Sequence, residues 1–383
     1  MKKEVDIVII GAGASGLMLG ALLENKNILI VDNNAKIGSK ILVSGGGKCN
    51  VTNGNINSKN YLGNQRFIRN VLKRFDQHAL LFWLAERGLT PIVRKNHQYF
   101  CENSSKELID LLGREISRKD IVLNVTVEKV EQKESVFEIL TSRGKIKAKQ
   151  VVVATGGLSF PKIGATDIGY KIAKSFGHEI STLSAGLVGF TVQPEQFFFK
   201  ELSGASLEVR ITTEQKSFVG DILFTHKGIS SPAVLNASLY WKKGQIEIDF
   251  LPDFDLSHMR GKKQISTILP LPKKVAKAFL EHLKIIDKPA ERLTAEEKAD
   301  LKRLQHYRFA PAGTFGYSKA EVTRGGVRTS EIDPYSMMSL LKPNLYFVGE
   351  VLAVTGELGG YNFQWAFSSA YCCAEAIKGE GDV

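Results

Sequence analysis

The stretch Val5-Asp-Ile-Val-Ile-Ile-Gly-Ala-Gly-Ala-Ser-Gly-Leu-Met-Leu-Gly-Ala-Leu-Leu23 decides the fold class of this chain. β-Branched residues lead to Gly11 and an Ala/Leu-rich helical pattern follows from Ala14, so the stretch predicts a strand, a tight turn and a helix. The glycines follow the spacing Gly-x-Gly-x-x-Gly, which turns the first amides of a helix toward a pyrophosphate. The alternative interpretation is the turn of an ordinary βαβ unit.

The three glycines and one acidic residue have distinct expected tasks. Gly11 allows the tight turn, Gly13 allows a phosphate to approach the backbone, and Gly16 allows the helix to pack closely on the strand. A second β-rich run, residues 27–31, ends at Asp32. An acidic residue about 20 positions after the first glycine is where a ribose hydroxyl is held. The sequence therefore predicts a bound dinucleotide.

Length and composition limit the possible classes of protein. A chain of 383 residues is expected to form two or three domains, and 43% hydrophobic with 24% charged residues is typical of a soluble globular protein. No apolar run reaches the ~18 residues of a membrane span, and Asp6 and the glycines argue against a signal peptide. The four cysteines lack zinc or redox spacing, the adjacent pair Cys372-Cys373 lies in a helical pattern that favours packed thiols, and a reducing, cytoplasmic setting is expected. The four cysteines are Cys49, Cys101, Cys372 and Cys373.

Positive charge is concentrated in two parts of the chain, whose formal net charge is +11. Residues 36–119 contain 15 Lys and Arg against 6 Asp and Glu, a net of +9. Residues 251–310 contain 13 against 8, a net of +5. Such segments form either a solvated basic face or a surface for nucleic acid or a phosphorylated substrate.

Further glycine-rich segments follow the first one. Glycines 45–47 precede Lys48-Cys49-Asn50 and give a backbone that can lie flat against a planar or anionic ligand. Residues 151–157 predict a buried strand that runs into a Thr-Gly-Gly turn. Residues 345–350 predict another buried strand, with a glycine-rich loop at 356–362 and a terminal helix after it. A second Gly-x-Gly-x-x-Gly is absent, so a separate NAD(P)H domain is not supported.

The hydrophobic pattern predicts an interrupted α/β domain. Residues 67–90 are expected to be helical, with Gly88 as a stop signal. From about residue 186 short alternating runs predict an inserted antiparallel sheet or barrel, and residues 255–306 read as helices. The expected domains are a Rossmann-like domain over residues 1–186 and 330–383, a β-barrel over 187–252 and 308–329, and a helical insert over 253–307.

Seven segments together resemble the YhiN/BaiN-like FAD-binding flavoproteins, also called the aminoacetone oxidase family. The Gly-Gly-Gly-Lys-Cys-Asn and Gly-Gly-Tyr-Asn pieces are the most specific, and the resemblance covers essentially the whole chain. It implies an α/β fold with a discontinuous Rossmann-like FAD-binding domain, an inserted antiparallel β-barrel and a helical cap. The matching segments are residues 11–16, 40–53, 154–164, 223–233, 322–327, 331–334 and 349–366.

The resemblance implies FAD as the resident cofactor, NAD(P)H as a transient electron donor, and no metal. It places the backbone of Val127 at the adenine, and Gly349 and Glu350 at the ribityl chain. The amides at the start of the last helix would offset negative charge on the reduced flavin. The residues predicted to bind the cofactor are Gly11, Gly13, Ala14, Ser15, Gly16, Asp32, Asn33, Lys40, Gly46, Gly47, Cys49, Asn50, Val127, Ala154, Thr155, Gly156, Gly157, Gly349, Glu350, Gly359, Gly360, Tyr361 and Asn362.

The chain departs from the family pattern at four positions. Ser39 and Lys48 stand where the family more often has arginine, and Ser231 stands where glycine is usual. Lys48 keeps the charge but lacks the bidentate fork of arginine. Ala353 stands where an aspartate is usual, so the family role of that carboxylate is not carried over.

Because a flavin carries out the hydride chemistry itself, the protein needs only to bind and orient the reactants and to deliver a proton. The candidate proton donors are Cys49, His226 and Lys48. A lone histidine is more often structural, and Cys49 is equally interpretable as a packed thiol. His226 gains weight only from its position in a matching segment.

The resemblance predicts an FAD-dependent oxidoreductase that NAD(P)H reduces and that then reduces an activated C=C bond. Activities associated with the family are reduction of uridine in 23S ribosomal RNA, reduction of unsaturated steroid-type compounds and oxidation of small amines such as aminoacetone. The substrate, the choice of NADH or NADPH and the oligomeric state do not follow from the sequence. The basic segments favour RNA, with the Lys-rich helical insert as its docking surface. A flavin-bound redox sensor or an RNA-binding module is the non-enzymatic alternative.

Overall fold

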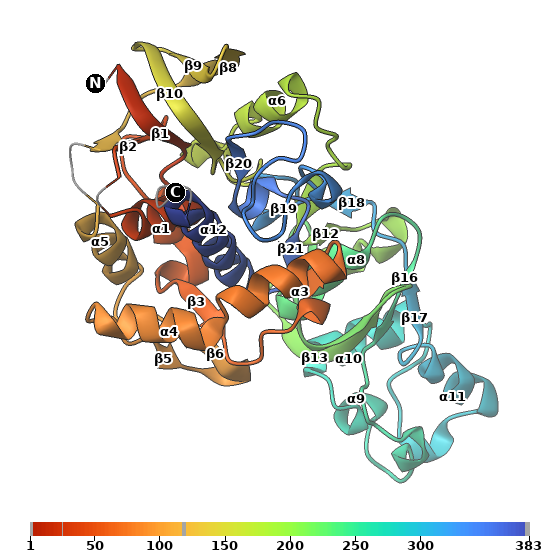
Figure 1. The fold of residues 1–383 in the computed structure, drawn as a ribbon. Helices are drawn as coiled ribbons and strands as arrows, with labels where there is room; N and C mark the ends of the chain where they lie inside the picture. The colour runs from red at the N-terminus through yellow and green to blue at the C-terminus, as the bar shows by residue number, and fades with distance from the viewer. Residues whose placement is uncertain (1–2, 25, 117–119, 380–383) are drawn as a thin grey trace. The chain divides into compact units, whose positions relative to one another are not determined.

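The predicted strand, turn and helix at the start of the chain are present in the computed structural model, which describes residues 3–24, 26–116 and 120–379 (Figure 1). Strand β1 (Glu4–Ile10) leads through the glycine turn into helix α1 (Ala14–Leu22). Val8 and Ile9 of β1 are fully buried. A continuous apolar run of this kind is typical of a parallel strand that is covered on both faces.

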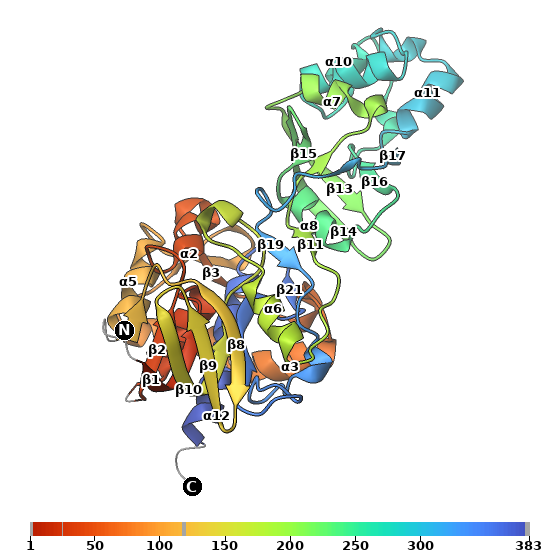
Figure 2. The same cartoon turned by 90° about the horizontal axis from the view of Figure 1, so that it is seen from above.

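A seven-stranded sheet organises the first part of the chain, with strand order β7-β2-β1-β10-β9-β8 and β20 paired with β10. Figure 2 shows β10, β9 and β8 side by side. The pairs β1–β2, β1–β10, β2–β7 and β10–β20 are parallel, whereas β8–β9 and β9–β10 are antiparallel. The remaining strands are β2 (Ile28–Val31), β7 (Ile121–Val122), β8 (Val127–Lys133), β9 (Val136–Thr141), β10 (Gly144–Val153) and β20 (Leu345–Phe347).

Helices and short strands complete this first unit. The run predicted as one helix over 67–90 is two helices, because Asp76 accepts a hydrogen bond from the amide of Ala79 and so begins a second helix. The helices are α2 (Ser39–Val43), α3 (Gln65–Arg74), α4 (Gln77–Glu86), α5 (Lys106–Arg114), α6 (Ile168–Ser175) and α12 (Tyr361–Gly379). The short strands are β3 (Asn50–Asn53), β4 (Tyr61–Leu62), β5 (Ile92–Val93), β6 (Gln98–Phe100), β19 (Val322–Arg324) and β21 (Thr355–Gly356).

The inserted part contains a second seven-stranded sheet, in the order β17-β16-β13-β14-β15-β12-β18. All its pairings are antiparallel. Its strands are β12 (Phe190–Thr191), β13 (Ser206–Thr212), β14 (Ser217–Thr225), β15 (Gly228–Ser230), β16 (Ile246–Asp249), β17 (Tyr307–Phe309) and β18 (Gly313–Thr314). Strand β11 (Ser184–Gly186) precedes them.

Only residues 310–312 join β17 to β18, the two edge strands of this sheet. A flat sheet of seven strands would hold its edges about 29 Å apart, whereas that link spans at most about 14 Å. The sheet therefore curls into a half-barrel. Pro311 lies in the link and has no N–H to donate, so the ladder does not continue through it.

The helical segment of the insert shares one hydrophobic core with the curled sheet. Phe279 of α10 lies with its ring centroid 4.6 Å from that of Phe250, and both side chains are fully buried. The helices of this second unit are α7 (Phe198–Glu201), α8 (Pro232–Tyr240), α9 (Ile265–Ile268), α10 (Lys273–His282) and α11 (Ala295–Lys302).

The chain divides into a first unit of residues 1–184 and 322–383 and a second unit of residues 185–321. The sequence-based division differs from this one, because it assigned residues 322–329 to the barrel. In the structure Thr323 hydrogen-bonds to residues of the first unit. The predicted α/β class, with a Rossmann-like sheet and an inserted antiparallel sheet, is confirmed. No helix among the described residues has the length and apolar character needed to cross a membrane.

Candidate functional site

The turn between β1 and α1 depends on two glycines for packing and has a third that faces open space. A Cβ on Gly11 would collide with the carbonyl oxygen of Ala154, and one on Gly16 with that of Gly11. Gly11 also has φ +113°, which favours glycine. No heavy atom lies within 4 Å of the position of a Cβ on Gly13, so its backbone remains accessible.

Asp32 closes this turn. One carboxylate oxygen accepts a 2.6 Å hydrogen bond from the amide of Ala12, and the other accepts two from the amide and side chain of Asn34. A carboxylate has about four acceptor positions, so three bonds leave capacity for one further donor such as a ribose hydroxyl. The neighbouring Asn33 is exposed and donates from its side chain to the carbonyl of Gly164 at 3.0 Å.

The carboxyl ends of three parallel strands meet beside this turn. The amide of Ala154, after β10, donates to Ile10, and that of Val348, after β20, donates to Val153. Gly349 then contacts α1, because a Cβ on it would lie 2.6 Å from Oγ of Ser15. This edge is where ligands bind in open α/β sheets. Ala14 and Ser15 occupy the first turn of α1, and Thr155 and Gly156 follow β10 at the same edge.

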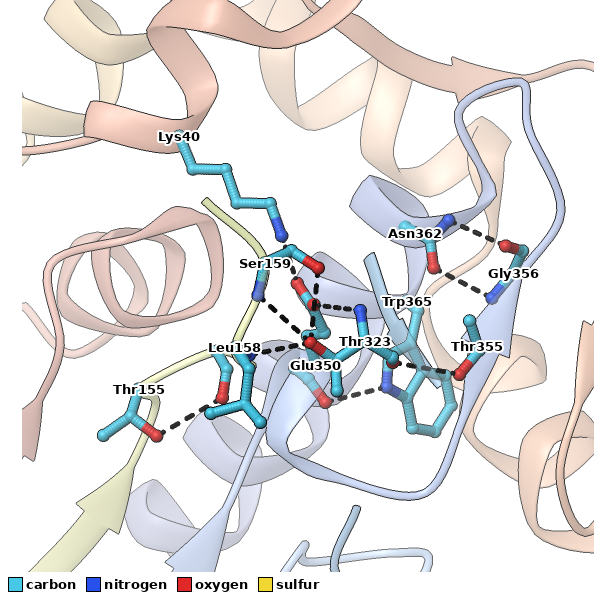
Figure 3. A network of polar contacts seen from close by, with 12 residues as sticks. Lys40, Thr155, Leu158, Ser159, Thr323, Glu350, Thr355, Gly356, Asn362 and Trp365 are labelled. Atoms are coloured by element: carbon cyan, nitrogen blue, oxygen red, sulfur yellow. Dashed lines mark hydrogen bonds and ion pairs between the residues drawn. The ribbon is translucent and has the colours of Figure 1, made fainter. Parts of the chain in front are cut away.

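Four segments far apart in the sequence meet in a network of polar contacts (Figure 3). The Lys40 ammonium and the Glu350 carboxylate form a 2.7 Å ion pair. The other carboxylate oxygen of Glu350 accepts a 2.8 Å hydrogen bond from the amide of Thr323. Oγ1 of Thr323 in turn accepts from the amides of Leu158 and Ser159. The network therefore joins α2, the turn after β10, β19 and the segment after β20.

A glycine is required next to this network. A Cβ on Gly157 would collide with the Thr323 side chain and lie 2.7 Å from the carboxylate of Glu350. Gly156 has φ +70° and open space where its Cβ would be. The Thr-Gly-Gly turn thus has one packed glycine and one accessible glycine.

The glycine run at 45–47 also presents an accessible backbone. No heavy atom lies within 4 Å of a Cβ on Gly46 or Gly47, and both have positive φ. The next residue, Lys48, is half-buried, and its ammonium lies 3.5 Å from the carbonyl of Glu102.

Cys49 follows this run and is fully buried, with φ +44°. Its thiol hydrogen-bonds with that of Cys101, and this contact together with burial raises the pKa of Cys49 well above its usual value. Asn50 begins β3, and its side chain is close to Gly360. Cys49 is therefore a protonated, packed thiol rather than an exposed one.

The start of α12 is tied down by short polar contacts. A Cβ on Gly360 would collide with the carbonyl of Thr52, and the side chain of Asn53 donates to the carbonyl of Gly359 at 3.0 Å. The side chain of Asn362 accepts from the amide of Gly356 and donates to its carbonyl, both at 2.8 Å.

The first residue of α12 is held as well. The hydroxyl of Tyr61 donates to the carbonyl of Tyr361 at 2.9 Å, and both tyrosines are buried. The first turn of a 19-residue helix is thereby held in one place, with its free amides and positive dipole end.

Two predicted residues take no part in the contacts described above. His226 is exposed in the turn between β14 and β15 of the second unit. Val127 is buried at the start of β8. The backbone contact with Asp32 is made by Val125, whose amide donates to the carbonyl of Asp32 at 2.9 Å.

Two residues of the polar network, Thr323 and Ser159, were not singled out from the sequence. Both lie in segments that match the family, at 322–327 and 154–164, and both are buried polar residues. Their position in those segments was the available signal.

The described residues fit a dinucleotide. The accessible glycines Gly13 and Gly156 belong to turns at the ends of the adjacent strands β1 and β10. A pyrophosphate needs backbone amides that no side chain covers, and a ribose needs an acceptor such as Asp32.

The family and the relatives of this chain agree with its sequence motifs. The family model described as "HI0933-like protein Rossmann domain" matches residues 5–376. A "Ribosomal RNA dihydrouridine synthase" of Haemophilus influenzae is 40% identical, over 99% of this chain and 100% of the relative. A protein of the same name from Escherichia coli is 37% identical, over 98% of each chain.

A third relative has a different named activity. The "3-dehydro-bile acid delta(4,6)-reductase" of Clostridium scindens is 30% identical, over 97% of this chain and 98% of the relative. All three names are those of enzymes that change the oxidation state of a substrate, and this chain is an oxidoreductase. The match over nearly its whole length shows that the chain belongs to the HI0933-like family, as the resemblance of its motifs predicted.

Proposed function

We propose that this protein binds FAD in its first unit, takes electrons from NAD(P)H and reduces uridine to dihydrouridine in 23S ribosomal RNA. The observation that supports this best is the 40% and 37% identity, over nearly the full length, to two relatives named ribosomal RNA dihydrouridine synthase. The proposal includes the expected cytoplasmic location, since that is where ribosomal RNA is found.

The residues of the first unit would hold FAD in three groups. The turn from Gly11 to Gly16 binds the pyrophosphate through backbone amides, and Asp32 accepts from a ribose hydroxyl. The segments at 46–50 and 154–157 line the ring and the diphosphate, and Val127 contributes backbone at the adenine. Gly349 and Glu350 lie along the ribityl chain, and residues 359–362 present the amides of α12. The supporting observations are the accessible glycines and the free acceptor position of Asp32.

Lys40 and Glu350 would act as a pair at this site. They form a 2.7 Å ion pair, and Glu350 also accepts a hydrogen bond from the amide of Thr323. The hydroxyl of Thr323 accepts in turn from the amide of Leu158, next to Gly157. The pair therefore positions three segments that approach the cofactor. When bound, FAD supplies the hydride for the C=C bond of the base.

Reduction of a C=C bond also needs a proton, which the protein or water delivers. Among the three candidates, Lys48 and Cys49 belong to the first unit and His226 to the second. The contact with Cys101 and burial raise the pKa of Cys49, so its thiol is protonated at neutral pH but is a weak acid. Lys48 is the more accessible of the two, because the side chain of Cys49 is fully buried. Cys49→Ser should keep FAD bound and lose turnover if Cys49 is the donor, and unchanged turnover would exclude it.

The test of the proposed function uses the purified yellow holoprotein. Under anaerobic conditions NADH or NADPH should bleach the flavin absorbance, and an unmodified 23S rRNA transcript should restore it and gain dihydrouridine. In cells, deletion of the gene should remove one dihydrouridine from 23S rRNA. An unchanged rRNA modification profile after deletion would contradict the proposal.

A second candidate function is reduction of a small unsaturated ketone, which the relative named as a bile acid reductase favours at 30% identity. It predicts reoxidation of the reduced flavin by an unsaturated steroid and no effect of rRNA. Release of hydrogen peroxide from aminoacetone without NAD(P)H would instead identify an amine oxidase.

A further inference from the structure

Helix α3 of the first unit carries an unusual charge distribution. Its ten residues, Gln-Arg-Phe-Ile-Arg-Asn-Val-Leu-Lys-Arg, include four cations and no acid. Phe67, Ile68, Val71 and Leu72 are buried, whereas Arg66, Arg69, Lys73 and Arg74 are exposed. At 100° per residue, Arg66, Arg69 and Lys73 lie within about 60° of one another around the helix, opposite the apolar face. They form a straight basic row.

The basic row forms no ion pair with any residue that the structure describes. None of the ion pairs within the part of the chain that the structure describes includes Arg66, Arg69 or Lys73. Part of the row opposes the stability of its own helix. Arg66 lies in the first turn, where the positive end of the dipole disfavours a cation, whereas Lys73 lies in the last turn, where a cation is favoured. The spacings of the row also bring like charges together.

Another helix of the same unit shows the usual arrangement. Helix α5 has Glu107 in its first turn and Arg114 in its last, in agreement with the helix dipole. Helix α3 retains charges that weaken it, and an anionic partner would offset that cost.

An exposed aromatic ring extends the row at its C-terminal end. The guanidinium of Arg74 lies over the ring of Tyr335, 5.9 Å from its centroid, and Tyr335 is 56% exposed. The nearby carboxylate of Asp333 accepts from the amide and hydroxyl of Ser336. Cations next to an exposed aromatic ring are the combination with which proteins bind single-stranded nucleic acid, since phosphates meet the cations and bases stack on the ring.

Helix α3 is held firmly next to the candidate FAD site. The ring centroids of Phe67 and Trp365 of α12 are 6.1 Å apart (Figure 1 shows the two helices together). At its N-terminal end, β4 pairs with β21, and a Cβ on Gly63 would lie 2.8 Å from the carbonyl of Ala353. The basic row therefore begins next to the segment that leads into α12.

We propose that the basic row of α3, Arg66, Arg69 and Lys73, together with Tyr335 is the surface on which the RNA substrate docks. The proposal rests on the proposed function and replaces the expected docking surface, the helical insert at 253–307. The cations of that insert are interspersed with acids and partly paired, as in the 2.7 Å contact of Lys288 with Glu297. The row places cations at axial steps of about 4.5 and 6 Å, which suits successive phosphates of one strand.

The test compares two triple variants of the FAD-loaded protein that lose equal charge. One is Arg66→Gln/Arg69→Gln/Lys73→Gln, and the control is Lys273→Gln/Lys277→Gln/Lys284→Gln, which removes three exposed cations of the insert. The probe is an unmodified 23S rRNA transcript, with Kd measured against KCl concentration. Loss of three phosphate contacts should lower the slope of log K against log salt by about 2 to 3 in the first variant alone.

Tyr335→Ala and Tyr335→Phe test the ring. Loss of base stacking should weaken RNA binding at least about fivefold in the alanine variant, whereas the phenylalanine variant should match the wild type. The rate at which NAD(P)H reduces bound FAD should be unchanged in all variants. A defect in RNA modification should therefore appear as a higher KM for the transcript and not as slower reduction of the flavin.

The outcomes separate the two proposals. If the wild type neither binds nor modifies the transcript, the proposed function fails and the docking surface fails with it. If the wild type modifies the transcript and the α3 variant does so with the same KM and salt slope, only the docking surface is overturned. A defect confined to the insert variant would return RNA docking to the helical insert.

Discussion

Gly13 and Gly16 lie three residues apart in one turn, yet their surroundings assign them different tasks. A Cβ at Gly16 would collide with the carbonyl of Gly11, whereas a Cβ at Gly13 would meet nothing within 4 Å. Neither residue has a positive φ, so the difference is one of space and not of backbone conformation. Gly16 serves the packing of α1 on β1, and Gly13 leaves room for a ligand.

A matched pair of alanine variants separates these tasks. Gly16→Ala should lower the thermal stability of the apoprotein, because the turn and α1 must move apart to admit a methyl group. Gly13→Ala should leave the melting temperature of the apoprotein unchanged and weaken FAD binding, because the methyl group covers the backbone that a phosphate approaches. Differential scanning calorimetry of the apoprotein and titration with FAD measure the two effects. Equal stability losses in both variants would contradict the assignment.

At the scale of elements, α12 is the helix against which the first unit packs. Phe75, just after α3, has its carbonyl held by the side chains of Gln364 and Ser368 of α12. Cys372, one turn further along α12, has its thiol 3.9 Å from the carbonyl of Val71 in α3. A cysteine at this contact acts as a small apolar group, and burial raises the pKa of the Cys372 thiol to about 12.

The raised pKa of Cys372 predicts a pH dependence of stability. Below the usual thiol pKa of about 9 the thiol is neutral in the folded and unfolded states and has no effect on the pH slope. Above it the unfolded thiol ionises and the folded one does not, so stability is lost as pH rises from about 9 toward 12. Cys372→Ala should reduce that loss by up to about 1.4 kcal/mol per pH unit in urea unfolding experiments. Identical alkaline slopes for variant and wild type would exclude the effect, and the slopes should coincide below pH 8 in any case.

At the scale of the whole molecule, the insert is one body in which helices and curled sheet share a core. Phe279 of α10 contacts Phe198, Phe199, Phe250 and Tyr307 through ring contacts of 4.6 to 6.1 Å. The sequence pattern predicts a helical insert within the inserted barrel, but it does not show which apolar faces of the two parts meet.

Phe279→Ala should destabilise the second unit by about 3 to 5 kcal/mol, since it leaves a large cavity in this shared core. The amide hydrogen exchange rates of β16 and α10 should then increase together. If the helices formed a domain of their own, only the exchange rate of α10 would increase. Ile286→Ala is the control, because Ile286 is 76% exposed and its loss should change stability by less than about 0.5 kcal/mol. Increased exchange in α10 alone would contradict the shared core.

The local pattern of the sequence determined the secondary structure, which depends mainly on residues that are close together in the chain. The stretch from Val5 to Leu23 encodes strand, turn and helix through its apolar run and glycine spacing, and the change of pattern after residue 186 indicated the inserted sheet. Contacts within a few residues set these features, so they are legible without a structure. The pattern does not show that the helical run over 67–90 divides at Asp76. An acidic residue caps a helix only where its own backbone leaves the helical conformation, as that of Asp76 does.

Only the tertiary structure decided which distant residues meet. It joined Lys40 to Glu350 across 310 positions, placed Thr323 in the first unit and enclosed Cys49 beside Cys101. It also arranged Arg66, Arg69 and Lys73 as an exposed row and placed Arg74 over Tyr335, whereas the sequence showed only a net positive segment. Such contacts arise from the packing of apolar faces such as that of α12 on α3, and no spacing within the chain specifies them. The glycine turn from Gly11 to Gly16 is encoded locally, but its contacts with Asp32 and Ala154 depend on that packing.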